Sequence, residues 1–166
     1  MLNPIDHDAV IRDGRVAGTF PDEIHPGVAW WIASCFIVMS QTRALAVAHD
    51  GQPTTEDFHR RFCQGAINAK HYACQVADLG AADEPTLLRA MKQLGDVPGA
   101  WLATDDTGGQ QVVAIRLYDA AGQPVDEETG LAKIRKMIAD DHVPIPVNEG
   151  AKGSVTNRRD LAGVTP

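Results

Sequence analysis

The chain has 166 residues, of which 44% are hydrophobic and 22% are charged, and this suits one globular domain whose core needs no disulfide. Its formal net charge of -7 argues against nonspecific nucleic-acid binding, which requires clustered basic residues. The most apolar run, residues 27–39, is shorter than the roughly 20 residues that a membrane span needs, and the first residues contain no apolar signal core. We therefore predict a cytoplasmic protein that binds neither nucleic acid nor a membrane.

Strand and helix patterns alternate along the chain. Short apolar runs predict strands at Arg15–Phe20, Ala44–Ala48 and Ala73–Ala77, and a hairpin over Gly99–Leu117. Helical spacing of apolar residues predicts helices at Glu23–Gln41, Thr54–Ala69, Pro85–Leu94 and Asp126–Asp140. This alternation predicts an α/β fold, a three-layer α/β/α sandwich with a mixed sheet, over residues 1–145. Residues 146–166 contain Pro, Gly and Asn and are expected to form an extended C-terminal tail.

The hairpin carries the most polar stretch between two predicted strands. Its tip, Thr104–Gln111, contains Asp105 and Asp106 followed by two glycines. Folds often expose reactive groups on such loops at a sheet edge. Aspartate and glycine are also favoured in turns, because the aspartate side chain bonds to nearby backbone groups. The sequence leaves both interpretations open: a plain turn, or a carboxylate pair that binds a cation or serves in acid–base chemistry.

Four segments, in this order, resemble the first domain of the α-D-phosphohexomutases, the phosphoglucomutase/phosphomannomutase family. Residues 11–20 resemble the Asp-Ile-Arg-Gly motif of that domain and the segment after it, and residues 44–55 resemble its strand and Gly-x-Asp-x-Arg turn. Residues 99–118 resemble the hairpin that holds the phosphorylated serine of the family, and residues 159–161 resemble the passage to its second domain. The resemblance covers almost the whole chain and implies the same α/β/α fold.

The chain departs from the family at the residues that carry chemistry. An ungapped match from Thr104 to Leu117 puts Asp106 at the serine position, Thr107 at the histidine and Arg116 at the lysine. Gln52 stands where the family has arginine. The chain also lacks the Asp-Gly-Asp-x-Asp metal loop and the sugar- and phosphate-binding loops, which belong to later domains of the family. The resemblance therefore implies no cofactor, with Mg²⁺ bound only if a partner supplies the missing ligands.

The resemblance also implies a set of candidate site residues. The catalytic candidates are Asp106, Asp105 and Arg116, and the ligand-binding candidates are Arg12, Thr104, Thr107 and Gly108. The family positions that match the two arginines face the active site, so both could converge on the aspartates and neutralise them or hold an anion. The alternative is that they are solvated arginines on an acidic protein.

A second group of possible ligands is His59, Cys63, His71 and Cys74. His59 and Cys63 are spaced i, i+4 on one predicted helix, as zinc ligands can be. The spacing of the four residues fits no common zinc module, however, and a buried cysteine behaves as a small apolar residue. The three cysteines of the chain also lack the pattern of a disulfide framework. We predict no metal site here.

The predicted helix Glu23–Gln41 is apolar on nearly two faces. A lone domain needs only one apolar stripe on such a helix, so a second copy of the chain could cover the other and form a two-fold homodimer. The alternative is a helix buried between the sheet and the C-terminal tail.

These features predict a stand-alone, diverged phosphohexomutase-like domain, a pseudoenzyme without mutase activity of its own, because the loop serine and the metal loop are missing. It would bind a small anionic ligand, such as a sugar phosphate, or a partner. One alternative is a repurposed small-molecule enzyme that uses the Asp105/Asp106 loop with Arg12 and Arg116. A second is an interaction module that completes a split phosphosugar mutase. The sequence leaves open whether the chain is an enzyme.

Overall fold

The computed structural model describes residues 10–12, 14–68, 73–140 and 153–162. Within these residues, seven strands form one sheet in the order β1-β2-β6-β5-β3-β4-β7. The strands are β1 (Ile11–Arg12), β2 (Arg15–Phe20), β3 (Ala44–His49), β4 (Gln75–Ala81), β5 (Gly99–Asp105), β6 (Gln111–Tyr118) and β7 (Ser154–Asn157). β5, β3, β4 and β7 run parallel to one another, whereas β6, β2 and β1 are joined by antiparallel pairings. The sheet is therefore mixed, as predicted.

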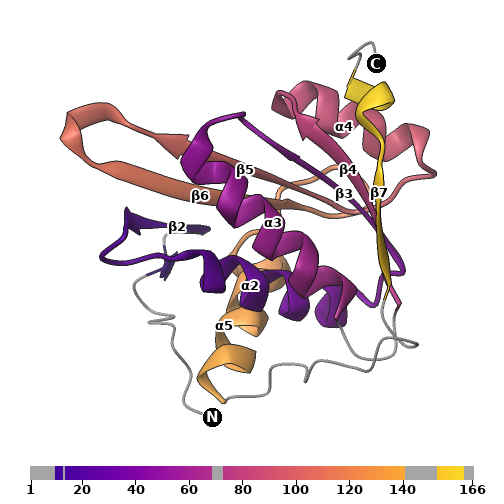
Figure 1. Cartoon of the computed structure of the whole chain (residues 1–166). Helices are drawn as coiled ribbons and strands as arrows, with labels where there is room; N and C mark the ends of the chain where they lie inside the picture. The colour runs from indigo at the N-terminus through magenta and orange to yellow at the C-terminus, as the bar shows by residue number, and fades with distance from the viewer. Residues whose placement is uncertain (1–9, 13, 69–72, 141–152, 163–166) are drawn as a thin grey trace.

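Helices cover both faces of this sheet (Figure 1). α2 (Pro26–Ser40), α3 (Pro53–Ile67) and α5 (Ala132–Ala139) share one hydrophobic cluster with one face, and α4 (Glu84–Gln93) packs in a second cluster on the other. Successive side chains of β3 point to opposite faces of the sheet. Leu45 and Val47 belong to the first cluster, and Ala46 and Ala48 belong to the second. The predicted three-layer α/β/α arrangement is confirmed.

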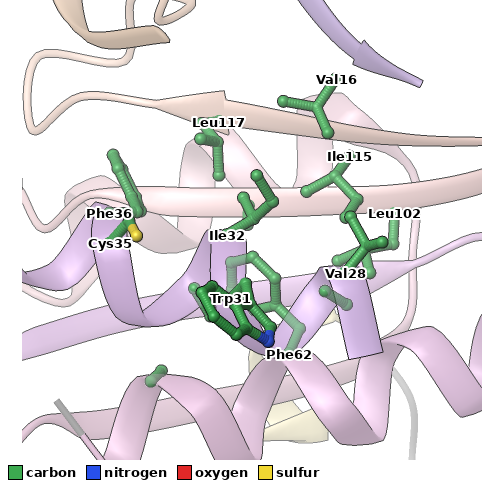
Figure 2. Close-up of a cluster of buried hydrophobic side chains, with 14 of the residues drawn as sticks. Val16, Val28, Trp31, Ile32, Cys35, Phe36, Phe62, Leu102, Ile115 and Leu117 are labelled. Carbon is green, nitrogen blue, oxygen red and sulfur yellow. The ribbon is translucent and has the colours of Figure 1, made fainter. Parts of the chain in front are cut away.

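The larger cluster forms where α2 meets the sheet and α3. Figure 2 shows Ile32 and Phe36 of α2 between strand residues such as Leu117 and the ring of Phe62 on α3. The backbones of the two helices also approach closely: the Ser34 hydroxyl donates to the Gly65 carbonyl oxygen at 2.8 Å. α2 thus has the sheet on one side and α3 and α5 against it. Its two apolar faces are explained by cover within the chain, and a homodimer through this helix stays a prediction.

α2 begins at Pro26, three residues later than the predicted start at Glu23. A residue before proline is disfavoured in the helical conformation, and His25 is accordingly extended. The His25 ring caps the helix, since its Nδ1 accepts a hydrogen bond from the Gly27 N–H at 3.2 Å. The Glu23 carboxylate instead accepts from the Thr19 N–H at 2.9 Å and supports the end of β2.

β4 also differs from the prediction, which placed this strand at Ala73–Ala77. Ala73 has a positive φ of 45°, which an extended strand cannot contain, so the strand begins two residues later. The strand then continues past the predicted end. Asp78 pairs with Val47 and Gly80 pairs with Ala48, so Leu79 is an extra residue that forms a β-bulge.

The C-terminal part of the described chain is extended, as expected, but it belongs to the sheet. β7 pairs in parallel with β4 at one edge, and a short 3₁₀ helix, Arg159–Ala162, comes after it. The predicted helix Asp126–Asp140 is present as a π-helical turn, Glu127–Leu131, that leads into α5. No helix within the described residues is long and apolar enough to cross a membrane.

Candidate functional site

The parallel strands β3, β4 and β5 end at the same edge of the sheet. Ligands of α/β proteins commonly bind at this carboxyl edge, because loops and helix starts gather there. The hairpin formed by β5 and β6 projects past the end of β3, and its tip reaches beyond the helices (Figure 1). The edge therefore presents the loop between β3 and α3, the hairpin tip, and the end of β4.

A polar network ties the base of the hairpin tip to the loop between β3 and α3. One carboxylate oxygen of Asp50 accepts from the Thr104 N–H at 2.8 Å and from the Gln52 amide at 3.1 Å. The Gln52 amide also donates to the Thr104 carbonyl oxygen, at 2.5 Å. The hydroxyls of Thr55 and Thr104 lie 2.5 Å apart, and both residues are buried. The Gln52 side chain thus helps to hold the hairpin.

The aspartate pair lies at the tip beyond this network. Asp105 is the last residue of β5, Asp106 comes directly after it, and both are exposed. The next residues form a 3₁₀ turn, Thr107–Gly109, in which Gly108 has a positive φ of 75° and open space around it. The tip is therefore a glycine-dependent turn that exposes carboxylates. Thr104 has its hydroxyl against Thr55, and the side chain of Thr107 lies outside what the structure describes.

The structure does not bring the two candidate arginines to this tip. Arg116 of β6 pairs with Trp101 of β5. This pair lies four residues along the strands from the last pair of the hairpin, Asp105 and Val112. The Arg116 guanidinium pairs with Glu84 at the start of α4 and lies 5.8 Å from the centre of the Trp101 ring. Arg12 pairs with Glu23 at 3.5 Å. Each arginine has an acidic partner elsewhere, and the structure does not show the convergence on the aspartates that the sequence left open.

The structure assembles only part of the group of possible ligands His59, Cys63, His71 and Cys74, at which we predicted no metal site. The Cys63 sulfur lies 3.8 Å from Nε2 of His59, but that nitrogen has a nearer partner, the Asp78 carboxylate at 2.9 Å. His71 lies outside the described residues, and Cys74 is buried just before β4. Burial raises the pKa of the Cys63 thiol and that of Cys74, the latter to about 12, so both stay protonated at neutral pH. Within the described residues, no group of three His, Cys, Asp or Glu side chains is arranged to hold a metal ion.

His59 instead belongs to a cluster that sequence patterns missed. Its ring lies 4.5 Å from that of His49, centre to centre, and both histidines line a cavity of 420 Å³. Burial alone would raise the pKa of Asp78. The hydrogen bonds from His59 and from the Gly80 N–H together outweigh burial, so the pKa of Asp78 is below its usual value. Arg159 also lines the cavity.

This cluster comes from β3, α3, β4 and the C-terminal segment, so no local spacing could indicate it. One signal was present in the sequence: Asp78 and Gly80 interrupt an apolar strand run, and such an interruption is typical of a bulge.

Comparisons with known proteins agree with this fold. Neither a family model nor a curated protein matches the sequence. Among solved structures, a phosphoglucomutase/phosphomannomutase family protein from Burkholderia thailandensis matches 92% of this chain with a TM-score of 0.68 and 16% identity. A putative phosphomannomutase from Thermus thermophilus matches 90% with a TM-score of 0.65 and 19% identity. The chain spans 33% of the length of each. The resemblance drawn from the four motifs is therefore confirmed for the fold, that of one domain of these proteins.

Proposed function

We propose that this chain is a phosphohexomutase-like domain that has no mutase activity on its own and binds a small anionic ligand at the carboxyl edge of its sheet. The observation that carries the first part is Asp106 at the hairpin tip, at the position that matches the phosphorylated serine of the family. Phosphoryl shuttling by a mutase needs an oxygen that takes up and returns the phosphoryl group, and a divalent cation that balances its charge.

The remaining polar groups near the tip support the absence of mutase activity. Mg²⁺ takes about six oxygen ligands and binds through carboxylates and phosphates. The Asp50 carboxylate already accepts hydrogen bonds from Gln52 and Thr104, and the Thr104 hydroxyl faces Thr55. Asp50 and Thr104 are therefore already engaged in the network at the base of the hairpin, which supports a tip without a resident Mg²⁺.

The anionic ligand is supported by the other end of the carboxyl edge. There Arg159 lines a cavity together with His49, His59 and Glu56. A guanidinium beside imidazole groups suits a carboxylate or phosphate ligand.

An assay of sugar-phosphate interconversion tests the loss of mutase activity. The purified chain is incubated with glucose 1-phosphate or mannose 1-phosphate and Mg²⁺, and formation of the 6-phosphate is monitored. We expect no turnover for the wild type and none for Asp106→Ser, because restoring the hydroxyl does not restore the metal ligands. A complete mutase serves as the positive control. Turnover by the wild type that Asp106→Ala abolishes would overturn the proposal.

As a second candidate function, we propose an interaction module that completes a mutase with a partner carrying the other domains. The chain matches a third of the length of the solved structures that share its fold. Copurification of the tagged chain with a second mutase-like chain, and sugar-phosphate turnover by the pair, would support this candidate. Turnover that does not depend on this chain would contradict it.

A further inference from the structure

His49 joins the end of β3 to the loop that leads into α3. It is the last residue of the strand, and it is 6% exposed. Nδ1 of its ring accepts a hydrogen bond from the Gly51 N–H at 3.0 Å. Gly51 has a positive φ of 87°, a conformation that suits glycine. The ring thus closes a tight turn around the residue between them, Asp50.

The hydrogen bond to Gly51 exists only while the His49 ring is neutral. An Nδ1 that accepts a hydrogen bond carries no proton, so the proton of the neutral ring is on Nε2. When the ring takes up a second proton, both nitrogens become donors. The protonated Nδ1 then faces another donor, the Gly51 N–H. Protonation of His49 therefore breaks this bond.

Asp50 connects this turn to the hairpin. Its carboxylate accepts from the Gln52 N–H at 3.1 Å and from the Thr104 N–H at 2.8 Å. The bond between His49 and Gly51 spans Asp50 and so restricts the direction in which the carboxylate points. Loss of that bond therefore weakens the contact between the loop and Thr104, at the base of the hairpin tip.

The end of β3 itself is held by bonds that do not involve the His49 ring. The Ala82 N–H donates to the His49 carbonyl oxygen at 2.9 Å, and the Asp50 N–H donates to the Leu102 carbonyl oxygen at 3.1 Å. These main-chain bonds are the same whether the ring is neutral or charged. Loss of the Gly51 bond is therefore a local change, which loosens the loop after Asp50 and leaves β3 in the sheet.

The groups around the His49 ring decide when it takes up a proton. The titratable and charged groups that face it come from every segment packed against it: His59 and Glu56 of α3, Asp78 of β4, Arg159 after β7, and Asp50 beside it. Burial and, to a smaller extent, the charge of His59 lower the pKa of His49, although the three carboxylates partly oppose this. A loosened loop exposes the ring to water, where the pKa of histidine is about 6.5. The open form then binds the proton more tightly than the closed form, and acid favours opening.

We propose that His49 is an acid-sensitive switch: uptake of one proton by its ring breaks the bond to Gly51, loosens the loop between β3 and α3, and releases the base of the hairpin that carries Asp106. At neutral pH the hairpin is held against the loop, and in acid its tip gains mobility. Removal of the proton restores the bond, so the change is reversible. The switch goes beyond the proposed function, and it does not depend on a ligand.

Amide hydrogen exchange of the full chain, measured by NMR at pH 7 and pH 5, tests the switch. Rates are compared as protection factors, which removes the direct effect of pH on exchange. We expect the protection of Gly51 and Thr104 to fall about fivefold or more, since one proton can shift an opening equilibrium by up to about tenfold per pH unit. Ala46, whose N–H bonds to the Pro98 carbonyl oxygen within the same strand pair, reports global unfolding. It should remain more protected than Gly51 and Thr104 at both pH values.

Two histidine variants show which ring is responsible. In His49→Asn, the amide oxygen still accepts from the Gly51 N–H but does not titrate, so the protection of Gly51 and Thr104 should change by less than twofold between the two pH values. His25→Asn is the matched control, because Nδ1 of His25 accepts from the Gly27 N–H in the same two-residue arrangement at the start of α2. This variant should keep the full acid response of the wild type.

The nitrogen chemical shifts of the His49 ring give a readout that needs no variant. At pH 7, Nδ1 should have the shift of an unprotonated nitrogen, and in acid it should become protonated in step with the loss of Gly51 protection. Constant Gly51 protection while Nδ1 takes up its proton would overturn the proposal. The same holds for an equal acid response in the wild type and His49→Asn, and for Gly51 and Thr104 amides as protected as that of Ala46. If Gly51 loses protection and Thr104 does not, the proposed release of the hairpin is wrong.

Discussion

At the scale of single residues, Asp106 changes what the hairpin tip can do. A serine hydroxyl is neutral until it is phosphorylated, whereas an aspartate carboxylate is charged at neutral pH without any modification. Asp106 places a carboxylate at the exposed tip without any modification. The turn around it depends on Gly108 and Gly109, whose positive φ values suit glycine. The tip keeps a shape that exposes this charge to solvent.

The buried ring of His49 should make stability depend on pH. Burial and, to a smaller extent, the charge of His59 lower the pKa of His49, although Asp78, Glu56 and Asp50 partly oppose this. The folded state then binds fewer protons than the unfolded chain, whose histidine pKa is about 6.5. The stabilisation is complete above that pH and is lost as the pH falls below it. We expect the free energy of unfolding to decrease between pH 7 and pH 5.

His49→Asn tests this dependence. The asparagine carbonyl oxygen can still accept from the Gly51 N–H, but the side chain no longer titrates. In urea unfolding measured at pH 7 and pH 5, the loss of stability should be smaller in the variant than in the wild type. Equal losses in the two proteins would show that His49 is not held neutral by its surroundings.

Residues that are adjacent in the chain could be predicted as a site, and those that are distant could not. Asp105, Asp106 and Gly108 lie close together between two strand patterns, and the structure does place them on an exposed tip. In the structure, Arg12 pairs with Glu23 and Arg116 pairs with Glu84. No local sequence pattern indicates these two ion pairs. The same limit applies to the cavity, because its lining comes from four separate segments.

At the scale of elements, the carboxylate of Asp50 holds the hairpin against the start of α3. One of its oxygens accepts two N–H groups, from Thr104 and Gln52, and the other accepts a third. Asp50→Asn replaces one of these acceptors by a donor, so at least one of the bonds is lost. We expect the Thr104 amide to exchange its hydrogen at least tenfold faster, and stability to fall by about 1–3 kcal/mol.

Hydrogen exchange measured by NMR checks this expectation, with Asp106→Asn as the control. That substitution also removes one carboxylate charge from the hairpin region, but at an exposed position of the tip. It should leave the exchange of the Thr104 amide within twofold of the wild type. Comparable acceleration in both variants would mean that charge alone, and not the Asp50 bonds, sets the mobility of the hairpin.

Gly65 sets the distance between α2 and α3. A Cβ added to it would lie 2.2 Å from the backbone oxygen of Trp30, and no side-chain rotation can relieve a backbone clash. We expect Gly65→Ala to destabilise the protein by about 2 kcal/mol or more, although alanine has the higher helix propensity. The exposed neighbour Gln64 provides the control, since Gln64→Ala should change stability by less than about 0.5 kcal/mol. Chemical unfolding of both variants measures these changes in the free energy of unfolding. A Gly65→Ala variant as stable as the wild type would contradict the close packing of α2 and α3.

Most elements could be predicted because their patterns are local, but their ends depend on backbone geometry. The strand Arg15–Phe20 and the antiparallel hairpin agree with the prediction. The start of α2 was misplaced because the effect of Pro26 on His25 outweighed the acidic residues before it. β7 was missed as a strand because its four residues are all exposed and carry no alternating pattern.

At the scale of the whole molecule, the described residues form one domain of a fold that is about three times longer in the solved structures that share it. The predicted homodimer through α2 would have to use partly buried residues such as Trp30 and Met39, since most of the helix is buried within the chain. Light scattering at high concentration tests it. A dimeric mass that Trp30→Glu reduces to that of a monomer would support the homodimer, and a monomeric wild type would contradict it.

The central claim is that this scaffold no longer carries a phosphoryl group, and the mass of the intact chain tests it most directly. The purified protein is incubated with a hexose bisphosphate and Mg²⁺, and its mass is measured under neutral, non-denaturing conditions. We expect the mass of the unmodified chain, in the wild type and in Asp106→Ala alike. A gain of one phosphoryl group in the wild type that Asp106→Ala lacks would contradict the claim.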